Sequence, residues 1–188
     1  MTLPNKKLGF GLIEVMVASA MIMMVLIALT MATKSSLRGN QDIHLRASAL
    51  FLAQEGLETG RGIRDNNWSS NSGAGWKALK WSGNALTDVD LTTATCYKIE
   101  YKDAVKGMGL TTITCPTSVA DTSAQESIQI EQDNADTFYR YIKIESVGNL
   151  GAPVANDTNA LKMTAYVTFG DKKQVVVSEV LTDWLQKY

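Results

Sequence analysis

The sequence predicts an α+β protein, in which one long N-terminal helix packs on a C-terminal antiparallel β-meander. The first observation is an apolar run at residues 12–32, where Glu14 is the only ionised residue. About twenty such residues form a helix of ~30 Å, which matches the hydrocarbon thickness of a bilayer. The second observation is that β-branched and aromatic residues alternate with polar ones over much of residues 96–188, as in a sheet with one covered face.

The bulk composition restricts the classes of function. The chain has 188 residues, a net charge of −1 and an ordinary apolar content, which is enough for one compact domain beyond the apolar run. A protein that binds nucleic acid usually carries a basic stripe or a basic tail. The sequence has neither, so nothing in it indicates direct nucleic-acid binding.

The apolar run follows two lysines, Lys6 and Lys7. A secretory signal peptide has the same positive start, but its apolar part is shorter and ends at a small-residue cleavage site. This run is longer and lacks a clear site of that kind. A signal anchor, with the lysines held in the cytoplasm by the positive-inside rule, is the alternative on physical grounds.

The stretch KKLGFGLIEV, residues 6–15, resembles the class III signal of type IV prepilins and pseudopilins. That pattern is a short basic leader ending in Gly, followed by Phe and by an apolar start with Glu at the fifth mature residue. Gly9, Phe10 and Glu14 match it, while Gly11 stands where Thr is commoner. The resemblance covers only the N-terminal part of the chain.

The resemblance implies that residues 1–9 are a leader peptide. A prepilin peptidase/N-methyltransferase is expected to cut between Gly9 and Phe10 on the cytoplasmic side of the membrane and to N-methylate Phe10. Residues 10–33 are then retained as a hydrophobic helix, which crosses the membrane or lies in the core of a filament.

Glu14 needs a physical explanation, because a carboxylate in hydrocarbon costs about 2.5–3.5 kcal/mol. Cleavage after Gly9 creates an α-amino group on Phe10, one helical turn away. Glu14 can pair with that amine, on its own chain or on a neighbouring subunit, and the pair offsets much of the cost of burying both charges. We therefore predict an assembly role for Glu14. The alternative is that Glu14 lies at the headgroup level, in contact with water.

The helix is predicted to continue beyond the membrane as an amphipathic segment, residues 34–62. Gly60 and Gly62 predict its end, because a polar stretch follows them. Apolar or small residues recur at helical spacing in this segment and are expected to lie on the head. These residues are Ile43, Ala47, Leu50, Phe51 and Leu57.

Residues 63–95 are predicted to be a loop region, because Ser, Asn and Gly are frequent in its first part. Trp76 and Trp81 are expected to anchor this region to the core, since Trp is rarely left in solvent. The alternative is a sugar-binding or adhesive patch built on the same two tryptophans.

Two strand patterns flank a turn that is predicted near Val105 and Lys106. Cys96 then lies opposite Cys115, at a distance compatible with a disulfide. The head is outside the cytoplasm if the lysines are inside, and an oxidising compartment favours the bond. Two free thiols are the alternative. A metal site is not predicted, because two cysteines and His44 cannot supply four ligands.

Three further strand patterns occupy residues 137–147, 161–169 and 174–181. Together with the hairpin they predict an antiparallel sheet head over residues 96–188. The long helix is the only predicted element available to cover one face of this sheet. Trp184 is expected to close the core.

The sequence shows no catalytic arrangement: no nucleophile with a partner, no set of histidines and no phosphate loop. We therefore predict a protein that is not an enzyme and has no cofactor. A calcium loop at Asp88 and Asp90, or at Asn156 and Asp157, is an alternative without the ligand spacing of an EF-hand.

These observations and the resemblance predict a structural subunit of a type IV pilus-like filament. The expected partners are the prepilin peptidase/N-methyltransferase, other pilin subunits, the cytoplasmic membrane and an assembly platform. Before assembly the chain is expected to span that membrane once, with its N-terminus inside and its head outside; afterwards it belongs to an extracellular or periplasmic filament. The alternatives are a minor pilin or pseudopilin of a type II secretion or DNA-uptake system, and a signal-anchored extracellular binding domain.

Overall fold

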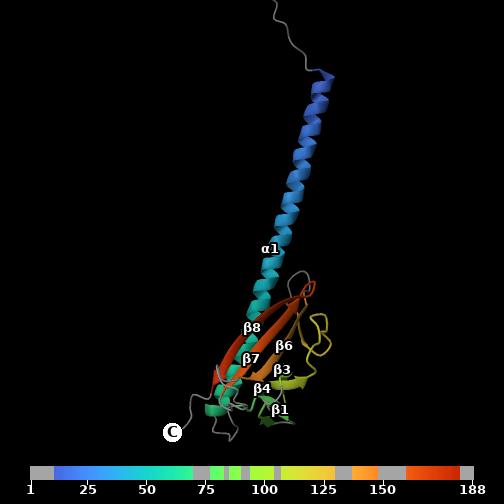
Figure 1. Ribbon diagram of the computed structural model, residues 1–188. Coiled ribbons are helices and arrows are strands. Elements are labelled where there is room, and N and C mark those ends of the chain that lie inside the picture. Colours follow the sequence, from blue (N-terminus) through green and yellow to red (C-terminus); the bar gives the residue numbers. More distant parts are fainter. Residues whose placement is uncertain are drawn as a thin grey trace, which may run out of the picture. The chain divides into compact units, whose positions relative to one another are not determined.

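The computed structural model describes residues 11–69, 77–82, 85–89, 94–103, 107–129, 137–147 and 160–182. The chain forms two compact units, Met1–His44 and Leu45–Tyr188, which divide within helix α1 (Figure 1). Helix α1 spans Leu12–Ser69, and no proline interrupts the sequence between Pro4 and Pro116. Its first half is rich in Leu, Met and Ala, which are among the residues with the highest helix propensity.

The second unit contains one sheet, to which eight strands contribute among the described residues. The strands are β1 (Lys80–Ser82), β2 (Ala85–Thr87), β3 (Thr95–Lys102), β4 (Gly107–Ile113), β5 (Glu126–Gln129), β6 (Thr137–Ser146), β7 (Ala160–Phe169) and β8 (Lys173–Thr182). The short strands β1 and β2 fall inside the region that was predicted to be loop. The predicted α+β class, one long helix with an antiparallel sheet, is confirmed.

The order of the strands differs from a simple meander. It is β2-β1-β4-β3-β6-β7-β8, with β5 paired to β6, and the single bridge Lys80↔Leu110 between β1 and β4 is parallel. Strands β6, β7 and β8 follow one another as predicted, but β6 pairs with β3, through Tyr97↔Ile142, and not with β4. The connection over residues 114–136 is long enough to bring the chain back beside β3.

The β3–β4 hairpin has a register that differs by two residues from the predicted one. Lys102 pairs with Gly107, so Cys96 pairs with Ile113 and not with Cys115. A shift of two residues keeps every side chain on its original face of the sheet. The disulfide between Cys96 and Cys115 therefore still forms, with the two Cα atoms 5.0 Å apart. The predicted bond is confirmed and the predicted register is wrong.

The predicted end of the helix at Gly60 and Gly62 is also wrong, because α1 continues to Ser69. Ile63 and Asn67 are buried on the same face of the helix as Gly60, and the Asn67 side-chain amide donates a hydrogen bond of 2.8 Å to the carbonyl of Ala78. Packing against the head thus outweighs the loss of about 1 kcal/mol that each glycine brings to a helix.

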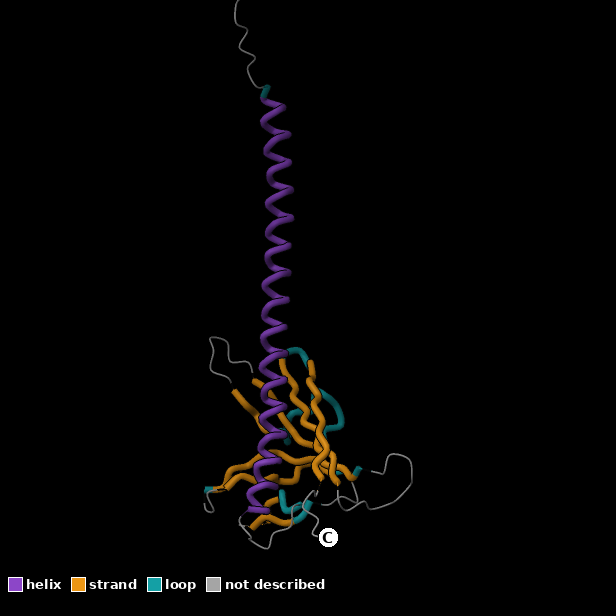
Figure 2. The backbone as a smooth tube through the Cα atoms, turned by 90° about the vertical axis from the view of Figure 1, so that its left-hand side faces the viewer, coloured by secondary structure: helices purple, strands orange, loops and turns teal. Residues whose placement is uncertain are grey.

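Figure 2 shows the C-terminal part of α1 lying across one face of the strands. Several residues of α1 that face the sheet are small: Ala49 and Ala53 are completely buried, and Gly56 and Gly60 follow at helical spacing. A Cβ atom added to Gly60 would lie 2.3 Å from the terminal methyl of Met163. The helix can approach the sheet this closely because glycine has no side chain there.

The prediction of which face of α1 covers the head is therefore mostly wrong. Of the five residues in that prediction only Leu57 is buried. Ile43 and Phe51 are each 69% exposed, and Ala47 and Leu50 are exposed as well. Other large apolar residues of this segment, Leu45 and Leu52, pack against the core instead.

The core of the head lies between α1 and the sheet. Strand β7 contributes Leu161, Met163, Ala165 and Val167 to it, all buried. These residues alternate with outward-facing ones, as a strand with one covered face requires. A turn joins β7 to β8, and in it Gly170 has a φ of 49°, which glycine adopts without strain.

Candidate functional site

The predicted processing residues Gly9 and Phe10 lie outside the described part of the chain. The structure begins at Gly11, and α1 starts one residue later. Glu14 lies in the first turn, where its backbone N–H donates a hydrogen bond of 3.0 Å to the carbonyl of Gly11. A negative charge is favoured at this end of a helix by the macrodipole. The Glu14 side chain is exposed, so a group from outside the helix can reach its carboxylate.

The first part of α1 carries an unusually large apolar surface. The large apolar side chains at residues 12–31 are between 51% and 81% exposed. Soluble proteins rarely leave a continuous apolar surface of this size in water, and such surfaces contact a membrane or another protein. Among the described residues, α1 is the one helix that is long and apolar enough to cross a membrane.

The few polar side chains in this apolar segment make their hydrogen bonds within the helix. The hydroxyls of Ser19 and Thr30 each donate to the carbonyl three residues earlier, and that of Thr33 to the carbonyl four residues earlier, all at 2.8 Å. A hydroxyl satisfied in this way does not need water. These three residues are therefore compatible with an apolar environment around the helix.

In the head, Arg140 joins α1, β5 and β6. Its side chain is only 4% exposed. It donates two hydrogen bonds to the Glu126 carboxylate, of 2.9 and 3.0 Å, and a third of 2.8 Å to the backbone carbonyl of Leu52. A bidentate guanidinium–carboxylate pair of this kind is among the stronger charge-assisted contacts in proteins.

Gly56 makes room for this arginine. A Cβ atom at residue 56 would lie 3.3 Å from Cδ of Arg140 and 3.7 Å from one of its terminal nitrogens. The absence of a side chain at Gly56 thus permits the guanidinium to reach the helix backbone. The sequence contained a signal for Arg140, because strand alternation places it on the same face as Phe138 and Ile142.

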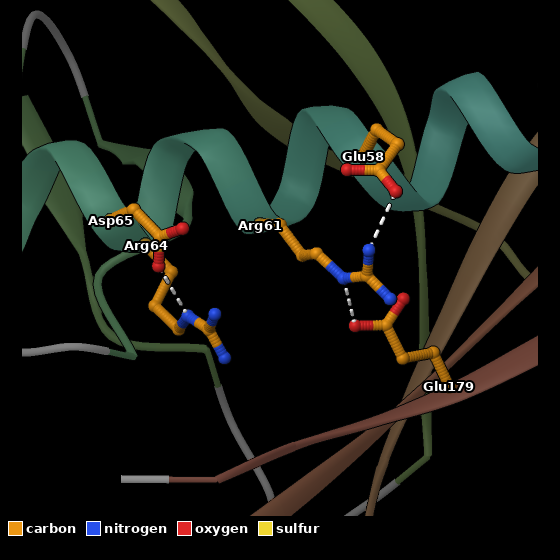
Figure 3. A network of polar contacts seen from close by, with 5 residues as sticks. All are labelled: Glu58, Arg61, Arg64, Asp65 and Glu179. Atoms are coloured by element: carbon orange, nitrogen blue, oxygen red, sulfur yellow. Dashed lines mark hydrogen bonds and ion pairs between the residues drawn. The ribbon is translucent and has the colours of Figure 1, made fainter. Parts of the chain in front are cut away.

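A second polar network connects α1 to β8 (Figure 3). Arg61 donates to Glu179 of β8 at 2.5 Å and to Glu58 of its own helix at 2.6 Å. The hydrogen bond to Glu179 is the main reason why the pKa of Arg61 is raised above its ordinary value. In a neighbouring ion pair, Nε of Arg64 lies 2.9 Å from Oδ1 of Asp65.

The sheet face away from α1 carries aromatic and charged residues. Tyr141 and Tyr166 stack with their ring centroids 4.7 Å apart, and burial raises the pKa of Tyr141. The carboxylate of Glu145 accepts contacts from two ammonium groups: Nζ of Lys143 lies 3.0 Å from one of its oxygens, and Nζ of Lys162 lies 3.3 Å from the other. The hydrogen bond from Lys143 is the main cause that lowers the pKa of Glu145.

Within the described residues, no three His, Cys, Asp or Glu side chains gather as a metal-binding group. Asp88 of the calcium alternative is exposed, while its partner Asp90 lies outside the described residues, as do Asn156 and Asp157. The side chains of Trp76, Trp81 and Trp184, for which anchoring roles were expected, also lie outside them.

The fold and the exposed apolar helix define a class: a chain with one N-terminal helix able to enter a membrane, joined to a disulfide-bonded β head. Residues 4–30 match the family described as "Prokaryotic N-terminal methylation motif". The chain therefore carries the signature of type IV pilins and pseudopilins, as its resemblance indicated. No curated protein and no solved structure matches the chain.

Proposed function

We propose that the chain is a structural subunit of a type IV pilus-like filament. The observation that carries this proposal is that Gly9, Phe10 and Glu14 fall inside the matched methylation motif, at the start of an apolar helix whose side chains are exposed. A helix with this surface can occupy a bilayer before assembly and contact other helices afterwards. The role is structural and not enzymatic.

The proposed processing follows from the motif. The prepilin peptidase/N-methyltransferase removes residues 1–9 and methylates Phe10, and an assembly platform extracts the subunit from the membrane. The positive charge on the new N-terminus then pairs with Glu14 of its own or a neighbouring chain. Pairing lowers the cost of placing either charge among apolar helices.

The proposed orientation has the lysines of the leader in the cytoplasm and the head outside it. The Cys96–Cys115 disulfide supports this orientation, because structural disulfides persist in oxidising compartments and are rare in the cytoplasm. The subunit thus lies in the cytoplasmic membrane before assembly and in an extracellular or periplasmic filament afterwards.

Mass spectrometry of the mature protein tests the proposal. We expect a chain that begins with N-methylated Phe10. A mature protein that retains residues 1–9 would overturn the proposal and support a signal-anchored binding domain. The amount of the protein in sheared surface filaments separates a major subunit from a minor pilin or a pseudopilin of a secretion or DNA-uptake system.

A further inference from the structure

A groove in the head lies between α1 and the edge strand β8. It has a volume of about 580 Å³. Phe51 and Leu57 from the helix and Val177 from the strand form its apolar part. Phe51 is 69% exposed, which is unusual for an aromatic residue at the side of a core and is typical of a surface that contacts a partner.

The groove is acidic. Its lining includes three carboxylates, those of Glu55, Glu58 and Glu179, against the single guanidinium of Arg61. That guanidinium already makes hydrogen bonds to both Glu58 and Glu179 (Figure 3). Glu55 is 62% exposed, and Arg140, which lies 3.7 Å from it, is held by the Glu126 carboxylate. The carboxylates in excess therefore favour a basic partner.

A basic segment that complements the groove occurs earlier in the same helix. Lys34 and Arg38 are exposed and lie on one face of α1, because they are four residues apart. Leu37 lies beside them and is 60% exposed. The backbone positions of Lys34 and Arg38 are about 6 Å apart along the helix axis and those of Glu55 and Glu58 about 4.5 Å, so the two pairs of charges are opposite in sign and similar in spacing.

We propose that in the filament the groove between α1 and β8 of one subunit binds residues 34–38 of a neighbouring copy of this chain. Leu37 then packs on Phe51, and Arg38 pairs with the carboxylates of Glu55 and Glu58. The contact requires two copies, since residue 38 of an α-helix cannot fold back onto residue 55 of the same helix. This inference rests on the proposed filament function.

The contact joins two different patches of the same chain, so it is heterologous. Such a contact does not close on itself in a dimer, and when its rotation does not close a ring it generates an open helical filament.

Disulfide trapping in assembled filaments tests this contact. The chain has two cysteines, and both are in the Cys96–Cys115 bond. An introduced cysteine is therefore expected to form a disulfide only with another introduced cysteine that lies close to it. Two differently tagged chains, one with Leu37→Cys and one with Gln54→Cys, are co-expressed, and the sheared filaments are oxidised. Because a disulfide needs Cα atoms within about 7 Å, we expect a heterodimer that carries both tags.

Val176→Cys is the matched control for Gln54→Cys. Val176 is exposed like Gln54, but strand alternation places it on the sheet face away from the groove. We expect the Leu37/Gln54 pair to give at least severalfold more heterodimer than the Leu37/Val176 pair. Equal yields would overturn the contact, and so would a dimer of two Gln54→Cys chains, which would show that the groove faces its own copy.

A charge exchange provides the second measurement. Arg38→Glu is expected to lower the yield of filaments severalfold, and adding Glu55→Arg is expected to restore part of it. If filaments with methylated Phe10 form but neither trapping nor rescue occurs, this contact is wrong and the proposed function stands. If the unaltered chain forms no filaments, the proposed function is wrong and this contact falls with it.

Discussion

In the first part of α1, at residues 12–31, the large apolar side chains are exposed. In the second part of the same helix the residues that face the sheet are buried, and they include the small residues Ala49, Ala53, Gly56 and Gly60. One helix thus carries two kinds of surface. Bulky residues are exposed in its first part, whereas small residues in its second part let the helix backbone approach the sheet of the head.

Apolar content alone therefore does not show which face of a helix packs against a sheet. Phe51 is exposed and Ala53, two residues later, is completely buried. The close approach at Gly60 and the passage of Arg140 over Gly56 both depend on the lack of a side chain. Stability of the head and assembly through the first part of α1 should therefore respond to different substitutions.

The largest expected effect concerns assembly alone. Glu14→Ala should reduce the yield of sheared filaments by more than about tenfold, because removing one partner of a buried ion pair costs about 3–5 kcal/mol. Membrane insertion should be unchanged. Ser19→Ala is the control in the same segment, since the Ser19 hydroxyl bonds only within the helix. Normal filament yield and normal methylation in Glu14→Ala would contradict the assembly role.

The next effect concerns the head alone. Arg140→Met keeps an apolar stem but leaves Glu126 and the carbonyl of Leu52 without their donor. We expect the free energy of unfolding to fall by about 3 kcal/mol, measured by chemical denaturation of the full chain in detergent. Glu55→Gln is the control. Glu55 is exposed, and its carboxylate lies 3.7 Å from Arg140, so this substitution should change the free energy of unfolding by less than about 0.5 kcal/mol.

A smaller effect, with opposite signs at two nearby positions, tests the close approach of α1 to the sheet. Gly62→Ala has nothing within 4 Å of the new Cβ atom and should stabilise the head by about 0.5–1 kcal/mol through helix propensity. Gly60→Ala must displace the side chain of Met163 within the core and should destabilise it by about 1 kcal/mol or more. Equal effects of the two changes in the same denaturation assay would refute the close approach.

The smallest effect is the pH dependence from Glu145. Its pKa in the folded chain is lowered from the ordinary value of 4.5, chiefly by the hydrogen bond from Lys143. The resulting stabilisation is complete above pH 4.5 and is lost as the pH falls through the lower pKa of the folded state. Denaturation midpoints from pH 6 down to pH 3 should therefore fall less in Glu145→Gln than in the unaltered chain. Parallel curves would show that Glu145 does not contribute.

The parts of this fold that follow from local pattern could be predicted from the sequence. The apolar run, the strands β6 to β8, the turn at Gly170 and the disulfide all depend on neighbouring residues or on alternation. The pairing of β6 with β3 could not be predicted, because strand order depends on how a long connection returns and not on the strands themselves.

The packing face and the end of α1 depend on contacts with the sheet. Gly60 has the propensity of a helix terminator, yet the burial of Ile63 and Asn67 extends the helix beyond it. Ile43 and Phe51 have the spacing of a core stripe, but the core uses the smaller residues Ala49 and Ala53. In the candidate site, a role for Glu14 could be predicted from the motif. The groove beside Phe51 could not be predicted, because its position depends on which face of α1 is covered by the sheet.

The hydrogen bond from Arg140 to the carbonyl of Leu52 has a consequence for sequence variation. Every residue offers the same backbone carbonyl, so this contact makes no demand on the side chain at position 52. A change of side chain at position 52 therefore leaves this acceptor in place, whereas Gly56 must still leave room for the guanidinium. Exposed residues of α1 can therefore diverge without the loss of this hydrogen bond between the helix and the head.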